Sequence, residues 1–342
     1  MSFDIIRMLP TPEEIASEIP LTKELNELKA KKDKEIVDII TGVSNKFLLI
    51  IGPCSADNED SVCDYINRLA KVQEKVSDKI FIVPRIYTNK PRTNGLGYKG
   101  MLHQPDPAED ENILSGIKQI RNMHIRVMRE SHLTGADEML YPENYEYAKD
   151  LVSYHAVGAR STENQQHRLV ASGIDIAVGM KNPMCGDISV MLNSIKAAQS
   201  SHTFIYNREE TLTSGNPLAH GILRGAVDHY GRNISNYHYE DVLDTAQKYI
   251  ETGLLNPTLI IDTNHSNSGK KYFEQPRIAM EIIKKRKYSD ILKNMVKGLM
   301  IESYIEEGTQ KVSDGVYGKS ITDPCLGWVD TEKLIMKMAE KL

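Results

Sequence analysis

The sequence predicts an α/β fold, a (β/α)8 TIM barrel with an N-terminal helical extension. Three observations support it. Short β-prone apolar runs alternate with amphipathic helical stretches from residue 47 onward, there are eight such runs, and polar or charged residues follow them. In a barrel these residues converge on the C-terminal rim, where active sites are built. A doubly wound open sheet has the same alternation, but it would spread the polar and charged residues along one edge. Because these residues are of types that act together in a site, their convergence favours the barrel.

Length and composition are those of one large globular protein. The chain has 342 residues, of which 40% are hydrophobic and 26% charged. We expect residues 1–44 to form an N-terminal arm and helix and residues 45–342 to form the (β/α)8 barrel. The net charge of −5 argues against nucleic acid as a partner. No signal-peptide pattern or membrane-spanning run is present, and the four cysteines form no CxxC pair, so we expect no membrane partner and a cytoplasmic location.

The first segments of the chain precede the barrel. Residues 1–20 contain three prolines and predict irregular structure. From about Leu21 to Ile40, apolar residues at helical spacing among lysines and glutamates predict an amphipathic helix. The eight predicted strands then follow in order: Phe47–Ile51, Ile80–Val83, Ile125–Met128, His155–Gly158, Ile176–Gly179, Thr203–Tyr206, Leu259–Ile261 and Leu299–Ile301.

Helix signals lie between the predicted strands. Asp187 can cap a helix that begins after it, and Pro276 suits a first helical turn. Asp330 or Thr331 can cap the final helix. Gly95-Leu-Gly97-Tyr-Lys-Gly100 matches the dinucleotide fingerprint GxGxxG, but Pro105 and Pro107 follow it where a helix should begin, so we reject a dinucleotide site.

Cations gather after the predicted strands. Six of them stand at strand ends: Arg85, Lys90, Arg92, Arg160, Lys181 and Arg224. One such residue alone is usually a surface or ion-pair residue, but six together exceed what one phosphate needs. Arginine binds oxyanions through a planar, bidentate fork. The pattern therefore predicts a ligand with phosphate and carboxylate groups, or two phosphorylated ligands.

A second set of rim residues could bind a metal ion. Cys54, His265, Glu302 and Asp323 combine a thiol, an imidazole and two carboxylates, a ligand set suited to Mn, Fe, Co or Zn. Residues so far apart form no local motif, and an inert core cysteine and an ordinary hydrogen-bonded histidine are the alternatives. Their shared position after predicted strands is the argument for a divalent metal ion.

The sequence also resembles a known family. The matching segments are Ile51-Gly-Pro-Cys-Ser55, Lys90-Pro-Arg-Thr93, Gly158-Ala-Arg160, Gly179-Met-Lys-Asn182, Ile222-Leu-Arg-Gly225, Asn264-His-Ser-Asn267, Ile301-Glu-Ser303 and Lys319-Ser-Ile-Thr-Asp-Pro-Cys-Leu-Gly-Trp328. Together they resemble the type I alpha class of 3-deoxy-D-arabino-heptulosonate 7-phosphate (DAHP) synthases over about residues 45 to 328. The resemblance implies a metal-dependent transferase that condenses phosphoenolpyruvate with erythrose 4-phosphate. This reaction begins the shikimate pathway to the aromatic amino acids, and relatives assemble as homodimers or homotetramers.

The resemblance also implies roles for individual residues. The implied metal ligands are Cys54, His265, Glu302 and Asp323. Phosphoenolpyruvate would be bound by Arg85, Lys90, Glu138 acting through water, the backbone of Ala159, Arg160, Lys181 and Arg224. Erythrose 4-phosphate would be bound by Pro91, Arg92, Thr93 and Asp323. Lys90, Cys54 and His265 are the expected catalytic residues.

Three rival functions stay open from sequence. The sister enzyme, 3-deoxy-D-manno-octulosonate 8-phosphate synthase, uses the same barrel with arabinose 5-phosphate, but it is expected to carry alanine and asparagine before the arginine at Lys90-Pro91-Arg92. An aldolase could form a Schiff base on Lys181, although the four-ligand set argues against it. A non-catalytic phosphosugar-binding barrel is the third, and the presence of all four ligands argues against that.

Two segments bear on regulation. The connection from His202 to Ser214 is shorter than the hairpin expected in feedback-regulated relatives, and the N-terminal arm is also short. Asp175 places a carboxylate where a regulated relative is expected to carry a small hydroxyl residue. We therefore expect weak or absent inhibition by phenylalanine and tyrosine.

Overall fold

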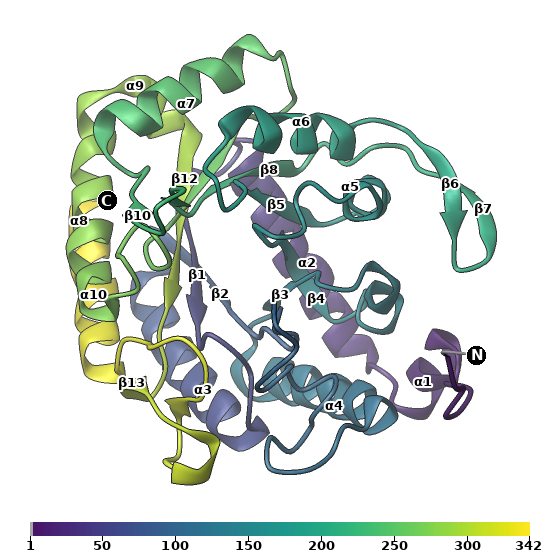
Figure 1. Ribbon diagram of the computed structural model, residues 1–342. Helices are drawn as coiled ribbons and strands as arrows, with labels where there is room; N and C mark the ends of the chain where they lie inside the picture. Colours follow the sequence, from purple (N-terminus) through teal and green to yellow (C-terminus); the bar gives the residue numbers. More distant parts are fainter. Residues whose placement is uncertain (1–2) are drawn as a thin grey trace.

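The computed structural model describes residues 3–342. Eight parallel strands form one sheet that curls into a barrel surrounded by helices (Figure 1). In chain order the strands are β1 (Phe47–Gly52), β2 (Ile80–Pro84), β3 (Gly135–Glu138), β4 (Val152–Val157), β5 (Ala177–Lys181), β8 (Ala219–Leu223), β11 (Leu259–Asp262) and β12 (Val296–Glu302). The predicted (β/α)8 class is confirmed.

The barrel closes weakly between β2 and β3. The strands are hydrogen-bonded in the order β2-β1-β12-β11-β8-β5-β4-β3, so β2 and β3 are the two ends of the ladder. One parallel bridge between Arg85 and Ala136 joins them, and the N–H of Ile86 donates to the carbonyl of Ala136 at 2.8 Å. We call this junction the seam. Every other pair of neighbouring barrel strands shares at least three paired positions, as β8 and β11 do.

Apolar side chains fill the barrel and also seal its N-terminal mouth. Because strand side chains alternate, every second residue of a strand points inward, as Leu48 and Ile50 of β1 do. The helix α2 (Lys23–Ile40) adds Ile36 and Ile39 to the same interior cluster and crosses behind the barrel in Figure 1. The N-terminal extension is therefore part of the barrel core, and the division at residue 44 stays a prediction.

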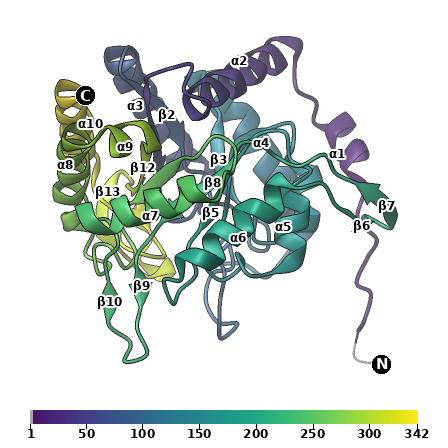
Figure 2. The same ribbon diagram turned by 90° about the horizontal axis from the view of Figure 1, so that it is seen from above.

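The outer layer consists of amphipathic helices that pack on the outside of the sheet (Figures 1 and 2). They are α3 (Glu59–Val76), α4 (Ile113–Ser131), α5 (Gln165–Ala171), α6 (Ile188–Gln199), α7 (Tyr239–Glu251), α8 (Gln275–Lys285), the short α9 (Asp290–Met295) and α10 (Trp328–Lys341). Their buried faces form one large cluster with the outward side chains of the strands, for example Leu69 of α3 with Ile51 and Ile82. Asp187 caps α6 and Pro276 lies in the first turn of α8, as predicted.

Two predicted strands are wrong. Ile125–Met128 lies inside α4, where it continues the helical spacing of buried residues such as Ile117 and Met123. The third barrel strand is instead Gly135–Glu138, whose short Gly-Ala-Asp-Glu sequence gives no apolar signal. Thr203–Tyr206 is β6, which pairs with β7 (Glu209–Leu212) in an antiparallel hairpin outside the barrel. Ala219–Leu223 takes its place as the sixth barrel strand.

Two predictions at the ends of helices are also wrong. Residues 1–20 are not wholly irregular, because Pro12–Glu18 forms α1 behind a capping box of Thr11 and Glu14. The last helix begins at Trp328 with Gly327 as its N-cap, so Asp330 and Thr331 lie within its first turn.

The hairpin and the N-terminal arm project from the same side of the barrel (Figure 2). Both contact the short helix η1 (Pro142–Tyr147): the Tyr147 hydroxyl donates to the carbonyl of Pro10, and the Tyr206 hydroxyl donates to that of Pro142. The smaller pairs β9 (Ala226–Val227) with β10 (Asn233–Ile234) and β13 (Glu306–Thr309) with β14 (Lys319–Ser320) follow β8 and β12. They add walls to the C-terminal rim.

Candidate active site

One pocket at the C-terminal rim collects most of the predicted site residues. Its volume is about 170 Å³. The predicted residues that line it are Cys54, Lys90, Pro91, Arg92, Glu138, Ala159, Arg160, Lys181, Arg224, His265 and Asp323. Six cations and two carboxylates face this space, since Lys270 joins the five predicted cations. The pocket therefore has a strongly positive wall suited to phosphate and carboxylate groups.

Arg85 and Glu302 lie beside this pocket rather than in its lining. Both are about 1% exposed, and an Nη of Arg85 donates to Oε1 of Glu302 at 3.0 Å. The guanidinium also stacks on Tyr87, 3.8 Å from the ring centroid. Its other Nη is buried without a hydrogen-bond partner, so Arg85 keeps a free donor. A buried donor of this kind is costly unless a ligand or water satisfies it.

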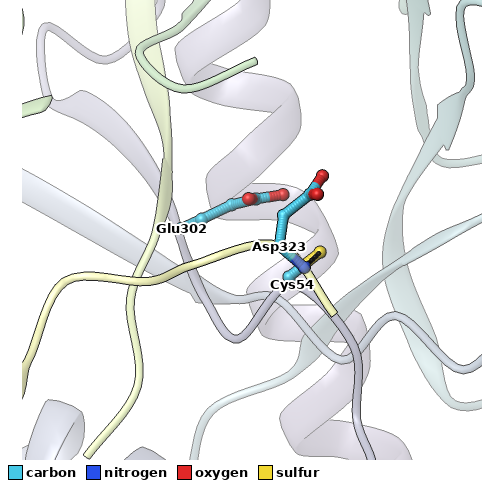
Figure 3. A group of neighbouring side chains, drawn as sticks. All are labelled: Cys54, Glu302 and Asp323. Atoms are coloured by element: carbon cyan, nitrogen blue, oxygen red, sulfur yellow. Dashed lines mark hydrogen bonds between the residues drawn. The ribbon is translucent and has the colours of Figure 1, made fainter. Parts of the chain in front are cut away.

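The thiol of Cys54 and the carboxylates of Glu302 and Asp323 lie close together (Figure 3). Cys54 and Asp323 line the pocket, and Glu302 lies beside it. The ligand atoms of Cys54, Glu302 and Asp323 all lie within 4.8 Å of one another. The Asp323 N–H donates to Sγ of Cys54 at 3.4 Å. Burial, followed by the charge of Glu302, raises the pKa of the Cys54 thiol, so its thiolate form needs a nearby cation. This donor set fits a borderline divalent metal ion.

His265 lies at the edge of this cluster. Its Nε2 is 3.9 Å from Oε1 of Glu302, and its Nδ1 is 2.8 Å from Oδ2 of Asp262. The residue has a positive φ of 45°, a backbone conformation that is uncommon for residues other than glycine. The Asp262 carboxylate thus lies next to Nδ1 without a hydrogen bond of regular geometry, in the place where a carboxylate often supports a metal-binding histidine.

Glu302 is held in place on several sides. The amide of Asn264 donates to its Oε2 at 2.5 Å. Gln275, at the start of α8, binds both the N–H and the carbonyl of Glu302 through its side-chain amide. The end of β12 is thereby fixed to the next helix, and the carboxylate has little freedom to turn away from Cys54.

Two further cations are positioned by buried polar partners. Lys181 Nζ donates to Oδ2 of Asp262 at 3.2 Å, and both side chains are at most 5% exposed. Burial alone would raise the pKa of Asp262, but His265 and Lys181 outweigh it and hold that pKa well below the ordinary value. Arg224 donates from Nη1 to the Ser266 hydroxyl at 3.2 Å.

Three asparagines tie the strand ends under these cations together. The Oδ1 of Asn182 accepts from the Arg224 N–H and from the amide of Asn236. The amide of Asn267 donates to the carbonyls of Leu223 and Asp262. Since these contacts link the ends of β5, β8 and β11, the cations on those strands keep fixed relative positions.

Lys90 lies on the loop after β2, near Cys54, Glu302 and Asp323, which we call the metal-type cluster. Burial opposes its charge, but Cys54, Glu302 and Glu138 outweigh that effect and raise its pKa. Lys90 is therefore held as an ammonium group at neutral pH. It can donate a proton or a hydrogen bond and is not suited to act as a base.

Across the seam, the side chain of Asp137 connects this loop to β3 by hydrogen bonds, a contact that we call the clasp. Its Oδ1 accepts from the N–H of Thr88 at 2.9 Å and from the N–H of Glu138 at 2.7 Å, and its Oδ2 accepts from the Thr88 hydroxyl at 2.5 Å. Lys90 follows Thr88 by two residues. A single buried carboxylate thus positions Lys90 on one side of the seam and Glu138 on the other.

Glycine at position 158 makes room for the side chain of Glu138. A Cβ there would lie 2.2 Å from Oε1 of Glu138, so a larger residue would force this carboxylate to move. Among the predicted residues, Thr93 is exposed and does not line the pocket. Arg92 does, with its Nε donating to the carbonyl of Tyr98 at 2.7 Å.

Several residues of this site were not predicted. Lys270 lines the pocket and its Nζ lies 3.3 Å from Oδ1 of Asp323. It lies in the loop after β11 with a positive φ of 62°, and nothing in the sequence pattern predicted that it would reach the pocket. Asp137 carried no signal either, because β3 itself was not recognised. Asn264 and Asn267 belong to a quoted motif, but their supporting contacts were not predicted.

The family model described as DAHP synthetase I family matches residues 19–336. The chain belongs to the DAHP synthetase I family. The family and the synthase activity expected from the sequence are confirmed. No helix within residues 3–342 combines the length and the apolar character needed to cross a membrane.

Individual relatives match over nearly the whole chain. The chain is similar to the Trp-sensitive phospho-2-dehydro-3-deoxyheptonate aldolase of Enterobacter agglomerans, with 37% identity over 98% of this chain and 95% of that protein. The Tyr-sensitive enzyme of Escherichia coli strain K12 is 34% identical over 98% and 94% of the two chains. The solved structure of the phospho-2-dehydro-3-deoxyheptonate aldolase from Francisella tularensis SCHU S4 superposes with a TM-score of 0.91, at 31% identity over 99% of this chain and 98% of that one.

The clasp across the seam leads to a prediction for stability against pH. Burial outweighs the hydrogen bonds to Asp137 and raises its pKa to about 7. The folded protein then binds this proton more tightly than the unfolded chain, so the contribution of Asp137 to stability is lost as the pH rises from about 4 through about 7. Asp137→Asn cannot ionise. We expect its free energy of unfolding, relative to the wild type, to increase between about pH 5 and about pH 8 in urea titrations.

The control for this experiment is Glu340→Gln, a neutralisation at an exposed position of α10. It should show no such trend. A difference between Asp137→Asn and the wild type that stays constant with pH would mean that the Asp137 carboxylate is already ionised across this range.

Proposed function

We propose that the rim pocket is the active site in which this chain condenses phosphoenolpyruvate with erythrose 4-phosphate to give DAHP and phosphate. The observation that carries the proposal is a pocket that combines a cationic wall with Cys54 and Asp323, whose ligand atoms lie within 4.8 Å of those of the adjacent Glu302. Both substrates are phosphorylated, and one of them also has a carboxylate. The site therefore matches the charges of the two substrates together better than those of either alone.

Cys54, Glu302, Asp323 and His265 would hold a divalent metal ion, and Mn, Fe, Co and Zn are the candidates. Their donor chemistry and the closeness of the ligand atoms of Cys54, Glu302 and Asp323 support this assignment. When bound, such an ion supplies Lewis-acid stabilisation for a developing negative charge on a carbonyl oxygen.

Phosphoenolpyruvate would lie against Arg160, Lys181 and Arg224, with Lys90 at one side. The backbone of Ala159 and, through water, Glu138 would complete this half of the site. Arg85 would reach it with its free buried Nη. The buried Nζ of Lys181 is already engaged by Asp262, which supports a binding role and argues against Schiff-base formation.

Erythrose 4-phosphate would bind at the outer part of the pocket. Pro91 and Arg92 line it, and Arg92 would contact the phosphate group. Asp323 would face the sugar from the metal side, and Lys270 is close enough to Asp323 to hold that carboxylate in place. Thr93 would join these contacts only if its loop closes over the sugar, since it does not line the pocket.

The reaction needs one carbon–carbon bond and one bond from C2 to the oxygen of water to form, and the bond from C2 to the phosphate oxygen to break. C3 of the enol phosphate attacks the aldehyde carbon, and the aldehyde oxygen gains negative charge and then a proton. Lys90, as a buried ammonium group, would donate that proton. Water adds at C2 and releases one proton, which restores the ammonium group of Lys90. The bond from C2 to the phosphate oxygen then breaks, the C2 hydroxyl becomes the ketone, and its proton leaves with the phosphate. Arg160, Lys181 and Arg224 would stabilise the leaving group's charge and fix its position.

The activity is tested by a phosphate-release assay with both substrates, with and without a chelator. We expect chelation to abolish phosphate release and Mn or Co to restore it. Cys54→Ala should lose activity while keeping its unfolding transition, because the fold buries this side chain without depending on a metal. Cys63→Ala, a second buried cysteine outside the pocket, is the control and should stay active. Full activity in excess chelator would contradict the metal assignment.

Two single substitutions test how the cations divide between the substrates. Arg92→Ala removes a charge-assisted contact of about 1.5–3 kcal/mol, so the apparent affinity for erythrose 4-phosphate should fall roughly ten- to a hundred-fold. Binding of phosphoenolpyruvate should change little. Lys181→Ala should show the opposite bias. Steady-state kinetics with each substrate varied in turn provides the measurement, and equal weakening of both substrates by both variants would overturn the division.

We also propose that the chain forms a homodimer or homotetramer in the cytoplasm. Exposed apolar side chains on the N-terminal arm (Phe3, Ile5 and Ile6) and on the hairpin (Ile205 and Leu212) support an assembly, because patches of this kind are usually covered. All four cysteines are free, which suits a reducing compartment. A monomeric mass in light scattering at assay concentrations would contradict the assembly.

Feedback control should be weak. The relatives named Trp-sensitive and Tyr-sensitive are regulated enzymes by their names. In this chain the hairpin is short, and Tyr206 already packs on η1 through its bond to Pro142. Asp175 adds a charge that would repel an amino-acid carboxylate. We expect little inhibition by phenylalanine or tyrosine at millimolar concentration with substrates near half-saturation, and strong inhibition by either would show that an effector still finds a site.

A further inference from the structure

A second cationic pocket lies at the opposite end of the barrel. Its volume is about 760 Å³. Lys46 and Lys79 directly precede β1 and β2, and Lys297 lies at the start of β12, so the pocket opens at the N-terminal mouth. Arg286 of η3 (Arg286–Tyr288) and Lys293 of α9 complete its cationic wall. We call these five residues the basal cations.

The basal cations lack matching negative charge. Asp78 is the one acidic side chain in the lining, and it is exposed. Within residues 3–342, the one ion pair of this group is between Lys46 and Glu35, at 3.8 Å. Lys79, Arg286, Lys293 and Lys297 are thus left without an ion pair to an acidic side chain. Lys293 is exposed, but the other three are half-buried, and charges at that depth are normally paired, so this arrangement is costly unless an anion is bound.

Their contacts with the protein are to neutral groups. Lys79 Nζ donates to the carbonyl of Ala339 at 2.8 Å, and Lys297 Nζ donates to that of Ile40. These carbonyls stand at the ends of α10 and α2, where cations interact favourably with the helix dipole. Such contacts use one donor of each ammonium group and cancel only part of its charge. Donors remain for a ligand in the pocket.

Among the basal cations, Arg286 has a guanidinium group whose orientation is fixed by contacts with the protein. Its guanidinium lies 4.8 Å from the centroid of Phe47, and an Nη donates to the carbonyl of Lys293 at 3.0 Å. Its Nε is buried with no hydrogen-bond partner. Burial lowers the pKa of Arg286 to about 10 and lowers that of Lys297, and no neighbouring carboxylate offsets either shift. The fork is fixed before any ligand arrives.

We propose that this basal pocket binds a small anion with two or more negative charges, of the phosphate or diphosphate class. The volume is that of a small-molecule site, and the concave shape with an overall acidic chain does not suit nucleic acid. The site is distinct from the active site, because the two lie at opposite ends of the same strands. The proposal does not depend on the assignment of roles at the rim.

Inorganic pyrophosphate is the probe, titrated calorimetrically into the full chain at constant ionic strength. Because the rim pocket can also bind this anion, the titrations are made in a Lys181→Ala, Arg92→Ala background. Arg286→Gln and Lys297→Gln keep a donor for the helix carbonyls and remove the charge. We expect each to weaken pyrophosphate binding at least ten-fold, the effect of losing one charge-assisted contact.

Lys287→Gln is the matched control, since it removes a charge from the exposed neighbour of Arg286 that does not line the pocket. Its affinity should equal that of the background. In the otherwise wild-type chain, Arg286→Gln should leave the KM for phosphoenolpyruvate unchanged. The same affinity in Arg286→Gln and Lys287→Gln, or no binding in the background at all, would overturn the proposal.

Discussion

Charge compensation beneath the C-terminal rim is the constraint on which the site depends. Arg85 pairs with Glu302 and Lys181 pairs with Asp262, all four almost without solvent contact. Each pair joins two strands that are separated by one other strand, β2 with β12 and β5 with β11. Alternate strands supply inward side chains at the same level of a barrel, which is why these partners meet. Removing one member would leave a buried charge uncompensated.

This constraint explains how so many cations can share one rim. The pairs neutralise the deepest cations, and the remaining ones face an open pocket where substrate anions can approach them. The same arrangement leaves Glu302 both as a partner of Arg85 and as a member of the cluster with Cys54 and Asp323. A substitution at Arg85 would therefore affect the metal-type cluster and the cationic wall together.

The fold class and most of the pocket could be predicted from the sequence, because barrel strands place chemically distinctive residues at their ends. Cys54, Lys90 and Arg224 are recognisable in this way. β3 could not be predicted, since a strand of four residues at the seam needs no apolar run. Its absence from the prediction also hid Asp137, whose function depends on a contact with Thr88, 49 residues away in the chain. Lys270 was not predicted as a site residue, because it reaches the pocket from within the loop after β11 and not from a strand end.

Because the seam between β2 and β3 is weak, bound substrates would also help to hold the barrel closed. Lys90 and Glu138 stand on its two sides, and the backbone joins them through one bridge. A molecule bound by Lys90 and Glu138 together would link β2 to β3 where the barrel has the fewest backbone pairings. The local opening motions of the empty protein should be concentrated here, and substrate binding would suppress them. The strand junction with the fewest backbone pairings is thus the one that a ligand held by both residues would reinforce.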